Sequence, residues 1–489
     1  MNDILNKRRA GILLHITSLP GTGSQGDLGE EAYNFVRFLR DTGVSIWQVL
    51  PLGMPHADGS PYQCLSAHAG NPALINSEWL IKQGWLQPSG KDEETAGSCA
   101  TRGELTKAYN GFLERAEQKD KDDFERFCQE KAFWLDDFAL FLALRNEFNE
   151  QCWNQWPEHF KTRDPKAINE ASLRFNTKIE CIKFEQYIFF RQWLELKAYA
   201  NQQGVFLFGD IPIFVSYDSA DVWAHRNVFK LNESGDMSVV AGVPPDYFSE
   251  TGQRWGNPHY DWDHLKATGF HWWVERMRTQ LEMFDIIRID HFRGLESAWE
   301  IPAQEDTAIH GEWIEAPGHD LLNAIKAEHG SMPLVAEDLG IITPGVEALR
   351  DEFELPGMKI LQFAFGGGPD NPYLPDNYDK NCVVYTGTHD NDTTLGWLQG
   401  ISDDEKNHIY NYLGNPTMPL HCALLHAALA SVANIAVIPM QDILELGAEH
   451  RMNTPGTTEG NWKWRFQWDQ LSHERANRFG YLIGLFNRK

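Results

Sequence analysis

The chain has 489 residues, of which 42% are hydrophobic and 12% aromatic, a balance that supports a sizeable core and excludes a disordered chain. Its formal net charge of −26 disfavours nucleic acid, anionic membranes and phosphorylated substrates as partners, which leaves a neutral substrate as the best match. The seven cysteines form no C-x-x-C pair, and the sequence contains no apolar leader and no run of about 18 apolar residues, so we expect a cytoplasmic protein without membrane spans.

Short apolar runs recur along the chain, and most of them are followed by a helical pattern. Near-continuous runs of Val, Ile, Leu and Phe are typical of parallel strands that are buried on both faces. Because strands joined by helical crossovers run parallel, this alternation predicts a (β/α)8 TIM barrel, with an open doubly wound sheet as the structural alternative. The eight expected strands cover residues 10–17, 44–52, 205–215, 284–290, 333–338, 358–365, 382–390 and 434–442.

Two long segments interrupt the alternation. The stretch between the second and third expected strands is too long for a loop, so we expect a large, mostly helical inserted subdomain over residues 53–180. A second insertion after the third strand, over residues 216–270, is rich in Gly, Pro, Trp and Tyr and is expected to form a lid subdomain. The whole chain, residues 1–489, is then a single barrel that carries two insertions.

Carboxylates stand at the ends of three expected strands. Asp290 ends the fourth, Glu337 the fifth and Asp390 the seventh. In a barrel of this kind, residues at the carboxyl ends of the strands point into a shared mouth, where catalytic groups gather. One strand-terminal Asp is more often a helix cap than a catalyst, but three at one mouth favour catalysis.

The surroundings of two of these carboxylates suggest a division of roles. Arg288 and Asp290 lie on one face of their strand, so the cation is expected to lower the pKa of Asp290 and keep it ionised, as a nucleophile requires. A purely structural ion pair is an equally good interpretation of these two residues alone. A second carboxyl group facing that anion is pushed toward its protonated form, which makes Glu337 the expected general acid.

Seven sequence motifs follow one another over nearly the whole chain: SLPGTGSQGDLG, GSPYQC, FGDIPIFV, IRIDHFRG, VAEDLG, YTGTHDNDTT and RMNTPGT…GNWKWR. Together they resemble the 4-α-glucanotransferases called amylomaltases or disproportionating enzymes, within the wider α-amylase clan. The combination of RIDHFRG, AEDLG and THDN is far more specific than any one of them. The resemblance implies a retaining enzyme that moves α-1,4-glucan segments between maltooligosaccharides through a covalent glucosyl-enzyme.

The resemblance also implies roles for the three carboxylates. Asp290 resembles the nucleophile that attacks the anomeric carbon. Glu337 resembles the acid that protonates the departing oxygen and then the base that activates the acceptor, with retaining chemistry expecting carboxyl groups about 5–5.5 Å apart. Asp390 resembles the third acid, which binds ring hydroxyls and favours the distorted sugar.

Further residues are assigned to the site by the same resemblance. Tyr62 is expected to stack on the sugar at the cleaved end, and Asp210 is expected to support the site. Arg288, His291 and His389 resemble residues that support Asp390.

Two loops are candidates for a lid that makes a sugar, rather than water, the acceptor. Residues 247–262 and 453–462 combine glycines with aromatic side chains. Trp255 and Asn453 are the expected glucan contacts, while rigid loops packed on the insertion are the alternative.

Three patterns imitate other sites. The segment 21–26 matches G-x-G-x-x-G, but no acidic residue ends the next strand to bind a ribose. The D-x-D pattern at residues 390–392 has no basic phosphate contacts nearby. His421 and His426 are five residues apart on an expected helix, so their side chains point roughly 140° apart around its axis. We therefore expect no metal and no cofactor.

Two alternative functions remain. An α-glucan hydrolase would use the same carboxylates with water as the acceptor. A non-catalytic glucan-binding barrel would have no use for a nucleophile and an acid on separate strand ends, so the intact carboxylates argue against it. The sequence makes no prediction of oligomeric state.

Overall fold

The computed structural model describes residues 4–21, 23–88, 100–245 and 249–489. Eight parallel strands form the main sheet in the order β10-β11-β12-β1-β2-β3-β6-β9, and each overlaps one of the expected runs. Their bounds are β1 (Arg9–Leu13), β2 (Ile46–Gln48), β3 (Phe206–Pro212), β6 (Ile286–Asp290), β9 (Leu334–Ala336), β10 (Gly357–Ile360), β11 (Cys382–Tyr385) and β12 (Ile435–Pro439).

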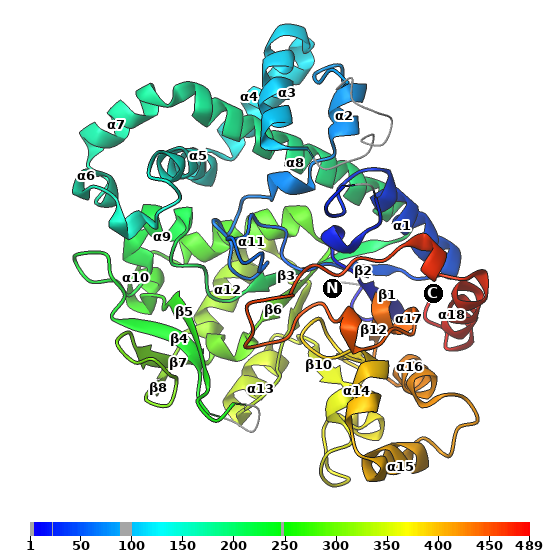
Figure 1. Ribbon diagram of the computed structural model, residues 1–489. Helices are drawn as coiled ribbons and strands as arrows, with labels where there is room; N and C mark the ends of the chain where they lie inside the picture. Colours follow the sequence, from blue (N-terminus) through cyan, green and yellow to red (C-terminus); the bar gives the residue numbers. More distant parts are fainter. Residues whose placement is uncertain (1–3, 22, 89–99, 246–248) are drawn as a thin grey trace.

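The sheet curls into a nearly closed barrel at the centre of the molecule (Figure 1). The two ends of the strand order meet where the backbone N–H of Ala336 donates to the carbonyl oxygen of Pro356 at 2.9 Å. Two residues further along both segments, the backbone N–H of Met358 donates to the Asp338 carboxylate at 2.7 Å. The predicted (β/α)8 barrel is therefore confirmed, and the open doubly wound sheet is excluded.

Apolar side chains fill the inside of the barrel. Phe208 and Ile286 belong to this buried cluster, together with residues from the other six strands. Residues two apart on a strand share a face, so Asp210, Arg288 and Asp290 stand on the inner face above that apolar layer. The polar site is thus placed at the carboxyl ends of the strands.

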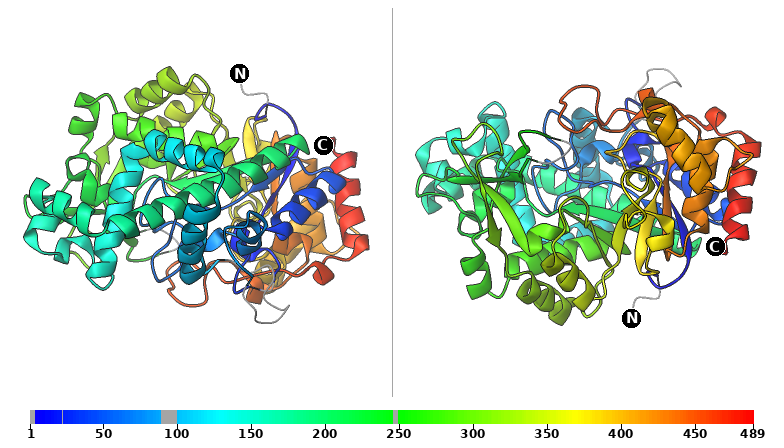
Figure 2. Two further views of the ribbon diagram at one scale, coloured as in Figure 1. Left: turned by 90° about the horizontal axis from the view of Figure 1, so that it is seen from above. Right: turned by 90° about the horizontal axis from the view of Figure 1, so that it is seen from below.

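Helices surround the barrel (Figures 1 and 2). The first helix and the last helix pack side by side on its outside, and Figure 2 shows them as the blue and red helices. The helices outside the two insertions are α1 (Glu30–Thr42), α11 (His271–Met283), α12 (Gly318–His329), α13 (Pro344–Glu352), α14 (Thr394–Gly400), α15 (Asp403–Tyr412), α16 (Leu420–Ala430), α17 (Met440–Ile443) and α18 (His473–Leu485).

Arg488 is fully buried at the amino ends of β1 and β12. Its guanidinium donates to the carbonyl oxygens of Leu429 at 2.6 Å, Ser431 at 3.0 Å and Arg9 at 3.2 Å. Its own carbonyl oxygen accepts from the N–H of Ala10 at 3.0 Å. These bonds tie the last residues of the chain to the first barrel strand.

The long segment between β2 and β3 is mostly helical, as expected. Figure 1 shows these helices along the upper and left edges of the molecule. The last of them, α8 (Asn176–Gln202), passes through the expected boundary at residue 180 and leads directly into β3. The preceding helices are α2 (Ser77–Lys82), α3 (Arg102–Arg115), α4 (Gln118–Glu130), α5 (Ala132–Glu147), α6 (Glu158–Lys161) and α7 (Pro165–Arg174).

Helix α8 holds the segment that follows β2 through two buried glutamines. Gln186 accepts from the N–H of Gly70 at 2.8 Å and donates to its carbonyl oxygen at 2.9 Å. Gln192 makes the same pair of bonds with the backbone of Asn76, at 2.9 and 3.1 Å. A Cβ atom at Gly70 would lie 1.9 Å from the ring of Phe189, so only glycine permits this approach.

A small antiparallel sheet, in the order β5-β4-β7-β8, lies beside the barrel (Figure 1). The segment 216–270 supplies β4 (Val239–Val243) and β5 (Gln253–Pro258), together with the short helices α9 (Ala220–Ala224) and α10 (Trp262–Ala267). The other two strands, β7 (Ser297–Pro302) and β8 (Glu312–Glu315), follow β6 in a segment that the sequence analysis did not single out.

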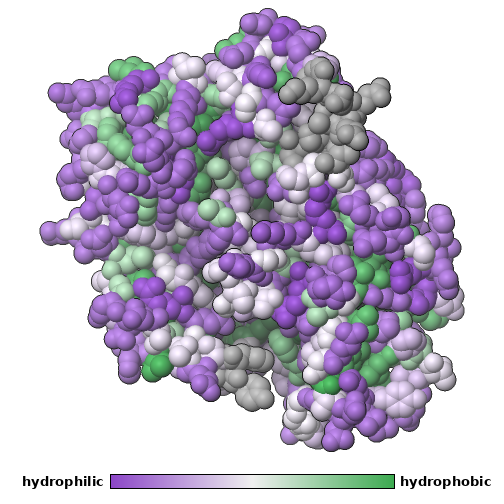
Figure 3. Space-filling view, viewed as in Figure 1, coloured by the Kyte–Doolittle hydropathy of each residue, from purple (hydrophilic) through white to green (hydrophobic). Residues whose placement is uncertain are grey.

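The exterior agrees with the acidic composition. The face shown in Figure 3 is mainly hydrophilic, with small scattered hydrophobic areas. No helix of the described residues has the length and apolar character needed to cross a membrane.

Candidate active site

The three carboxylates lie at one rim of the barrel. Asp290 is the last residue of β6, Glu337 directly follows β9, and Asp390 follows β11 in the loop that also carries His389. Because all eight strands run parallel, these positions share the carboxyl end of the sheet. The other residues that the sequence assigned to the site contact these three or each other.

Arg288 joins the carboxylates at the base of the mouth. Its Nη1 atom donates to both oxygens of Asp210, at 2.7 and 2.9 Å, and its Nη2 atom donates to Asp290 Oδ1 at 2.7 Å. The hydroxyl of Tyr62 donates to Asp210 Oδ2 at 2.7 Å. Asp210 therefore fixes both the guanidinium and the tyrosine, and the guanidinium fixes Asp290.

The pKa of Asp290 corrects one expectation from the sequence. Burial in the mouth raises it to about 6, and Asp210 and Asp390 add to the rise, while Arg288 opposes it. Arg288 lowers this pKa, as predicted, but burial and the Asp210 carboxylate, which binds the same guanidinium, outweigh the arginine. With a pKa near 6, Asp290 is still mostly ionised at neutral pH.

Glu337 has the opposite charge state. Its Oε2 atom accepts from the backbone N–H of His291 at 2.7 Å, and Oε1 accepts from that of Leu339 at 3.0 Å. Burial raises its pKa to about 8, with Asp290 acting in the same direction and Arg288 against it. A protonated carboxyl at neutral pH is the state that a general acid requires.

His291 contributes through its backbone. It has a left-handed conformation with φ of 55°, uncommon for a residue with a Cβ atom, and this turn aims its N–H at Glu337. Its ring meets the indole of Trp255 edge-on, with 4.8 Å between the centroids. The sequence grouped Arg288 and His291 as supports of Asp390, whereas their hydrogen bonds reach Asp210, Asp290 and Glu337.

Asp390 is the most exposed of the three carboxylates, with 47% of its side chain accessible. Its Oδ1 atom accepts from Asn453 Nδ2 at 2.6 Å, and Oδ2 lies 3.3 Å from His389 Nε2. Arg451 donates to its backbone oxygen at 3.0 Å. The enclosure of the mouth opposes ionisation, but His389 and Asn453 outweigh it and lower the pKa of Asp390 below its usual range. Asp390 is thus a fixed acceptor for hydroxyl groups.

Aromatic rings line one side of the mouth. The rings of Tyr62 and His389 stack with centroids 5.2 Å apart. Trp462, the aromatic residue of the candidate lid 453–462, lies 6.0 Å from each of them and has a left-handed φ of 64°. The sequence predicted a lid here but named Asn453 rather than Trp462 as its glucan contact, because the contact with Tyr62 joins the two ends of the chain. The candidate lid 247–262 is described only from residue 249 onward.

The nucleotide-like glycine segment 21–26 faces an arginine. Arg465 donates to the carbonyl oxygens of Gly21 at 3.0 Å and Gly23 at 2.6 Å. A phosphate-binding turn presents backbone N–H groups to its ligand, whereas these two peptides present carbonyl oxygens to a cation. Residue 22 lies outside the described residues.

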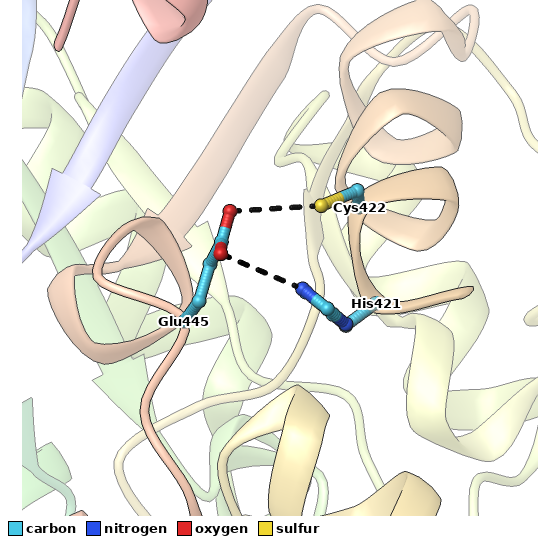
Figure 4. A group of neighbouring side chains, drawn as sticks. All are labelled: His421, Cys422 and Glu445. Atoms are coloured by element: carbon cyan, nitrogen blue, oxygen red, sulfur yellow. Dashed lines mark hydrogen bonds and ion pairs between the residues drawn. The ribbon is translucent and has the colours of Figure 1, made fainter. Parts of the chain in front are cut away.

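One group of side chains has the composition of a metal site (Figure 4). His421 and Cys422 of α16 and Glu445 offer ligand atoms within 4.8 Å of one another. Arg478 forms an ion pair with Glu445, and Arg475 lies 3.5 Å from the same carboxylate. Two guanidinium groups compete with a cation for this carboxylate, so the group is better described as an ion-pair network.

A parallel (β/α)8 barrel with three carboxyl groups gathered at the carboxyl ends of its strands has the arrangement that enzymes acting on glycosidic bonds use. Residues 14–471 match the family model for 4-alpha-glucanotransferase. The chain therefore belongs to the 4-alpha-glucanotransferase family and is a glycosyltransferase, which confirms the resemblance found in the sequence.

Individual relatives agree over the full length. The chain is 48% identical over 500 residues to 4-alpha-glucanotransferase from Synechocystis sp., with 99% of each chain covered. It is 48% identical to 4-alpha-glucanotransferase from Thermus thermophilus, over 96% of this chain and 97% of the relative. Its structure matches that of amylomaltase from Streptococcus agalactiae in complex with acarbose with a TM-score of 0.94 and 37% identity, covering 99% of this chain and all of the other.

Proposed function

We propose that the enzyme moves α-1,4-glucan segments between maltooligosaccharides with retention of configuration, using Asp290 as the nucleophile and Glu337 as the acid and base. The observation that carries this proposal is the placement of Asp290 and Glu337 at the ends of two neighbouring strands in the mouth, with Asp290 bound to the Arg288 guanidinium. Burial raises the pKa of Glu337 further, to about 8, than that of Asp290, to about 6, which favours a protonated acid beside an ionised nucleophile, as retaining transfer requires.

In the first step, Glu337 gives its proton to the glycosidic oxygen as the bond between that oxygen and the anomeric carbon breaks. An oxygen of Asp290 bonds to the anomeric carbon, and the shortened glucan leaves with the proton. In the second step, the Glu337 carboxylate takes a proton from the 4-hydroxyl of an acceptor glucan, whose oxygen displaces Asp290 from the anomeric carbon. The two steps restore both carboxyl groups.

The remaining site residues shape the transition state. Asp390, held by His389 and Asn453, accepts hydrogen bonds from ring hydroxyls. Tyr62 offers a ring face to the sugar and is kept in place by Asp210. Positive charge develops on the sugar ring as the bond breaks, and the surrounding carboxylates stabilise it.

Transfer rather than hydrolysis depends on keeping water from the glucosyl-enzyme. We assign this task to the loops that carry Trp255 and Asn453, with Trp255 acting from the inserted segment 216–270 and packing on His291. Hydrolysis by the same carboxylates is the less favoured alternative, since the family transfers glucan.

The cellular setting is part of the proposal. We place the enzyme in the cytoplasm, on neutral glucan and without nucleic acid, which the net charge of −26 and the six free cysteines of the described residues support. The segment 53–180 is proposed as a helical subdomain and 216–270 as a lid subdomain.

Incubation with maltotriose tests the reaction. We expect glucose and longer oligomers to form while the total of reducing ends stays constant; a rise in reducing ends in step with consumption would show hydrolysis instead. Asp290→Asn should abolish turnover. Asp285→Asn is the matched control, because Asp285 precedes the same strand at its opposite end, where it binds the N–H of Leu207. Full activity of Asp290→Asn would overturn the assignment.

A further inference from the structure

A second cavity lies next to the catalytic mouth. His389 is in its wall, but Asp290, Glu337 and Tyr62 are not. The cavity is lined by the carboxyl ends of β1 and β12, the loop after β11 and the C-terminal loop, with His15, Met452 and Trp464 among its lining residues. It therefore sits between His389 and the loop that carries Asn453.

Polar atoms around this cavity lack protein partners. Within the described part of the chain, His15 Nδ1, Trp464 Nε1 and Asp392 Oδ1 are buried and have no hydrogen-bond partner, and all three residues line the cavity. His15 as a whole is only 8% exposed. A buried polar atom without a hydrogen bond costs about 1–3 kcal/mol, so a polar ligand is expected in a cavity that several residues with such atoms line.

The chemistry of the lining limits what the ligand is. Burial lowers the pKa of His15 to about 3, with a smaller effect of His389, so its imidazole is neutral and offers one donor and one acceptor. The Trp464 indole can only donate. Asp392 disfavours an anion and Arg451, also in the wall, disfavours a cation. The ligand must be neutral and able both to accept and to donate.

Its size is limited as well. The cavity offers about 30 Å³ to the centre of a water molecule. One buried water needs roughly 10–15 Å³ by this measure, so this space suits about two waters.

We propose that this cavity is a buried water site for two water molecules bound by His15 and Trp464, and that His15 acts through them as a positioning residue for His389. The inference rests on the proposed function, in which His389 and Asn453 hold Asp390. His389 Nε2 lies 3.3 Å from Asp390, so a displaced imidazole displaces the carboxylate that binds the sugar.

The C-terminal loop connects the water site with Asp390 by a second route. Met452 lines the cavity, and its carbonyl oxygen accepts from the N–H of Trp462 at 2.7 Å. The next residue, Asn453, donates to Asp390 at 2.6 Å. Filling the cavity with a larger apolar group is expected to move the loop and His389 together.

A crystal structure of the unmodified protein at better than about 2 Å resolution tests the site itself. Density for water within hydrogen-bonding distance of His15 Nδ1 and Trp464 Nε1 is expected. A dry cavity, or direct hydrogen bonds from these atoms to protein groups, would overturn the inference whatever the enzyme does with maltotriose.

The positioning role is tested with His15→Phe, which removes the nitrogen atoms and fills the cavity. We expect kcat on maltotriose to fall roughly 10-fold or more with KM within about twofold of the unmodified value, because the change acts on the geometry of the transition state. His15→Asn, which keeps a donor and an acceptor, should recover most of kcat and provides a second variant if His15→Phe does not fold.

His426→Phe serves as the control, because this half-buried histidine of α16 packs on Phe486 away from the mouth. It should leave kcat unchanged. Unmodified kcat in His15→Phe, or equal losses in His15→Phe and His15→Asn, would refute the positioning role. Failure of the unmodified protein to transfer glucose units would instead refute the proposed function, while the water site stands or falls by its density.

Discussion

Two buried arginines mark the two ends of the barrel, and their partners differ. At the mouth, Arg288 binds the carboxylates of Asp210 and Asp290. At the opposite end, Arg488 donates to carbonyl oxygens, among them that of Leu429. Burial works against the charge of both, but the two carboxylates raise the pKa of Arg288 above its usual value, whereas the pKa of Arg488 falls to about 9.

The difference shows what each end is built for. Charges that face charges, as around Arg288, are strongly coupled, so a single proton changes the state of the whole mouth. A charge that faces peptide dipoles, as around Arg488, has partners that do not titrate. The mouth therefore responds to substrate and pH, while the opposite end serves stability.

The largest expected effect is at the mouth. Glu337→Gln removes the transferable proton, and we expect kcat on maltotriose to fall by roughly 10³-fold or more, in line with the size of general acid catalysis. The loss should be smaller with a donor whose leaving group needs no proton, such as an α-glucosyl fluoride, and parallel progress curves on the two donors measure this.

Stability should change in the opposite sense in the same variant. The pKa of Glu337 is about 8 in the folded protein and 4.5 without the protein's influence. Between these two values the unfolded chain releases the proton and the folded protein keeps it, so the stability of the folded protein falls as the pH rises from about 4.5 to about 8. Glu337→Gln avoids this fall, so at pH 9 its denaturant midpoint should equal or exceed that of the unmodified protein. A clear loss of stability would mean that Glu337 is a structural residue.

Next in size is the loss of the arginine at the opposite end. Arg488→Met leaves several buried carbonyl oxygens without donors, so we expect the free energy of unfolding to fall by about 2–4 kcal/mol. Activity per folded molecule should stay unchanged, as measured by kcat at a temperature well below the unfolding midpoint. A large fall in the kcat of Arg488→Met under these conditions would contradict a purely stabilising role for this end of the barrel.

The pH dependence of kcat/KM tests the charges of the mouth without any substitution. Below about pH 6, Asp290 becomes protonated and the nucleophile is lost, and above about pH 8, Glu337 loses the proton it must donate. We expect kcat/KM to rise and then fall, changing about tenfold per pH unit on either limb. A rate that keeps rising above pH 9 would contradict a protonated Glu337.

The smallest effect is expected where a neutral side chain supports a charge. Asn453→Ala removes the 2.6 Å hydrogen bond to Asp390, but His389 remains on its other oxygen. We expect a fall in kcat/KM of roughly 10-fold, the size of one hydrogen bond to a charged group. Asn461→Ala, in the same loop but bound to the backbone of Thr454 and Thr457, is the matched control in the same assay.

Local patterns predicted the barrel but not the small sheet. Buried parallel strands such as Ile435–Pro439 are almost wholly apolar, so a few consecutive residues are enough to predict each of them. The strand Glu312–Glu315 has only four residues, with an exposed Glu at each end and half-buried Trp313 and Ile314 between them, and it pairs with Ser297–Pro302. Two apolar residues are too short a pattern to predict a strand on their own.

The candidate site was predictable where its groups stand at strand ends and not where they meet across the chain. Asp290 and Glu337 follow from strand ends alone. The rise in the pKa of Asp290 comes first from its burial in the mouth, with a further contribution from Asp210, which binds Arg288 from 78 positions away. Neither the burial nor this contact can be read from the strand that carries Asp290, so the sequence predicted the opposite direction. Trp462 lies against Tyr62 only because the barrel brings the end of the chain back to its beginning.

The two glutamines of α8 limit where segments of this enzyme can be exchanged with those of its relatives. Gln186 and Gln192 grip the backbone at Gly70 and Asn76, in the stretch that leaves the Tyr62 loop. A cut at residue 180, the expected end of the helical insertion, would divide α8 near its start. Gln186 and Gln192 would then be separated from the first turn of their own helix. Chimeras between relatives should therefore exchange the Tyr62 loop and the complete α8 together, as one cassette.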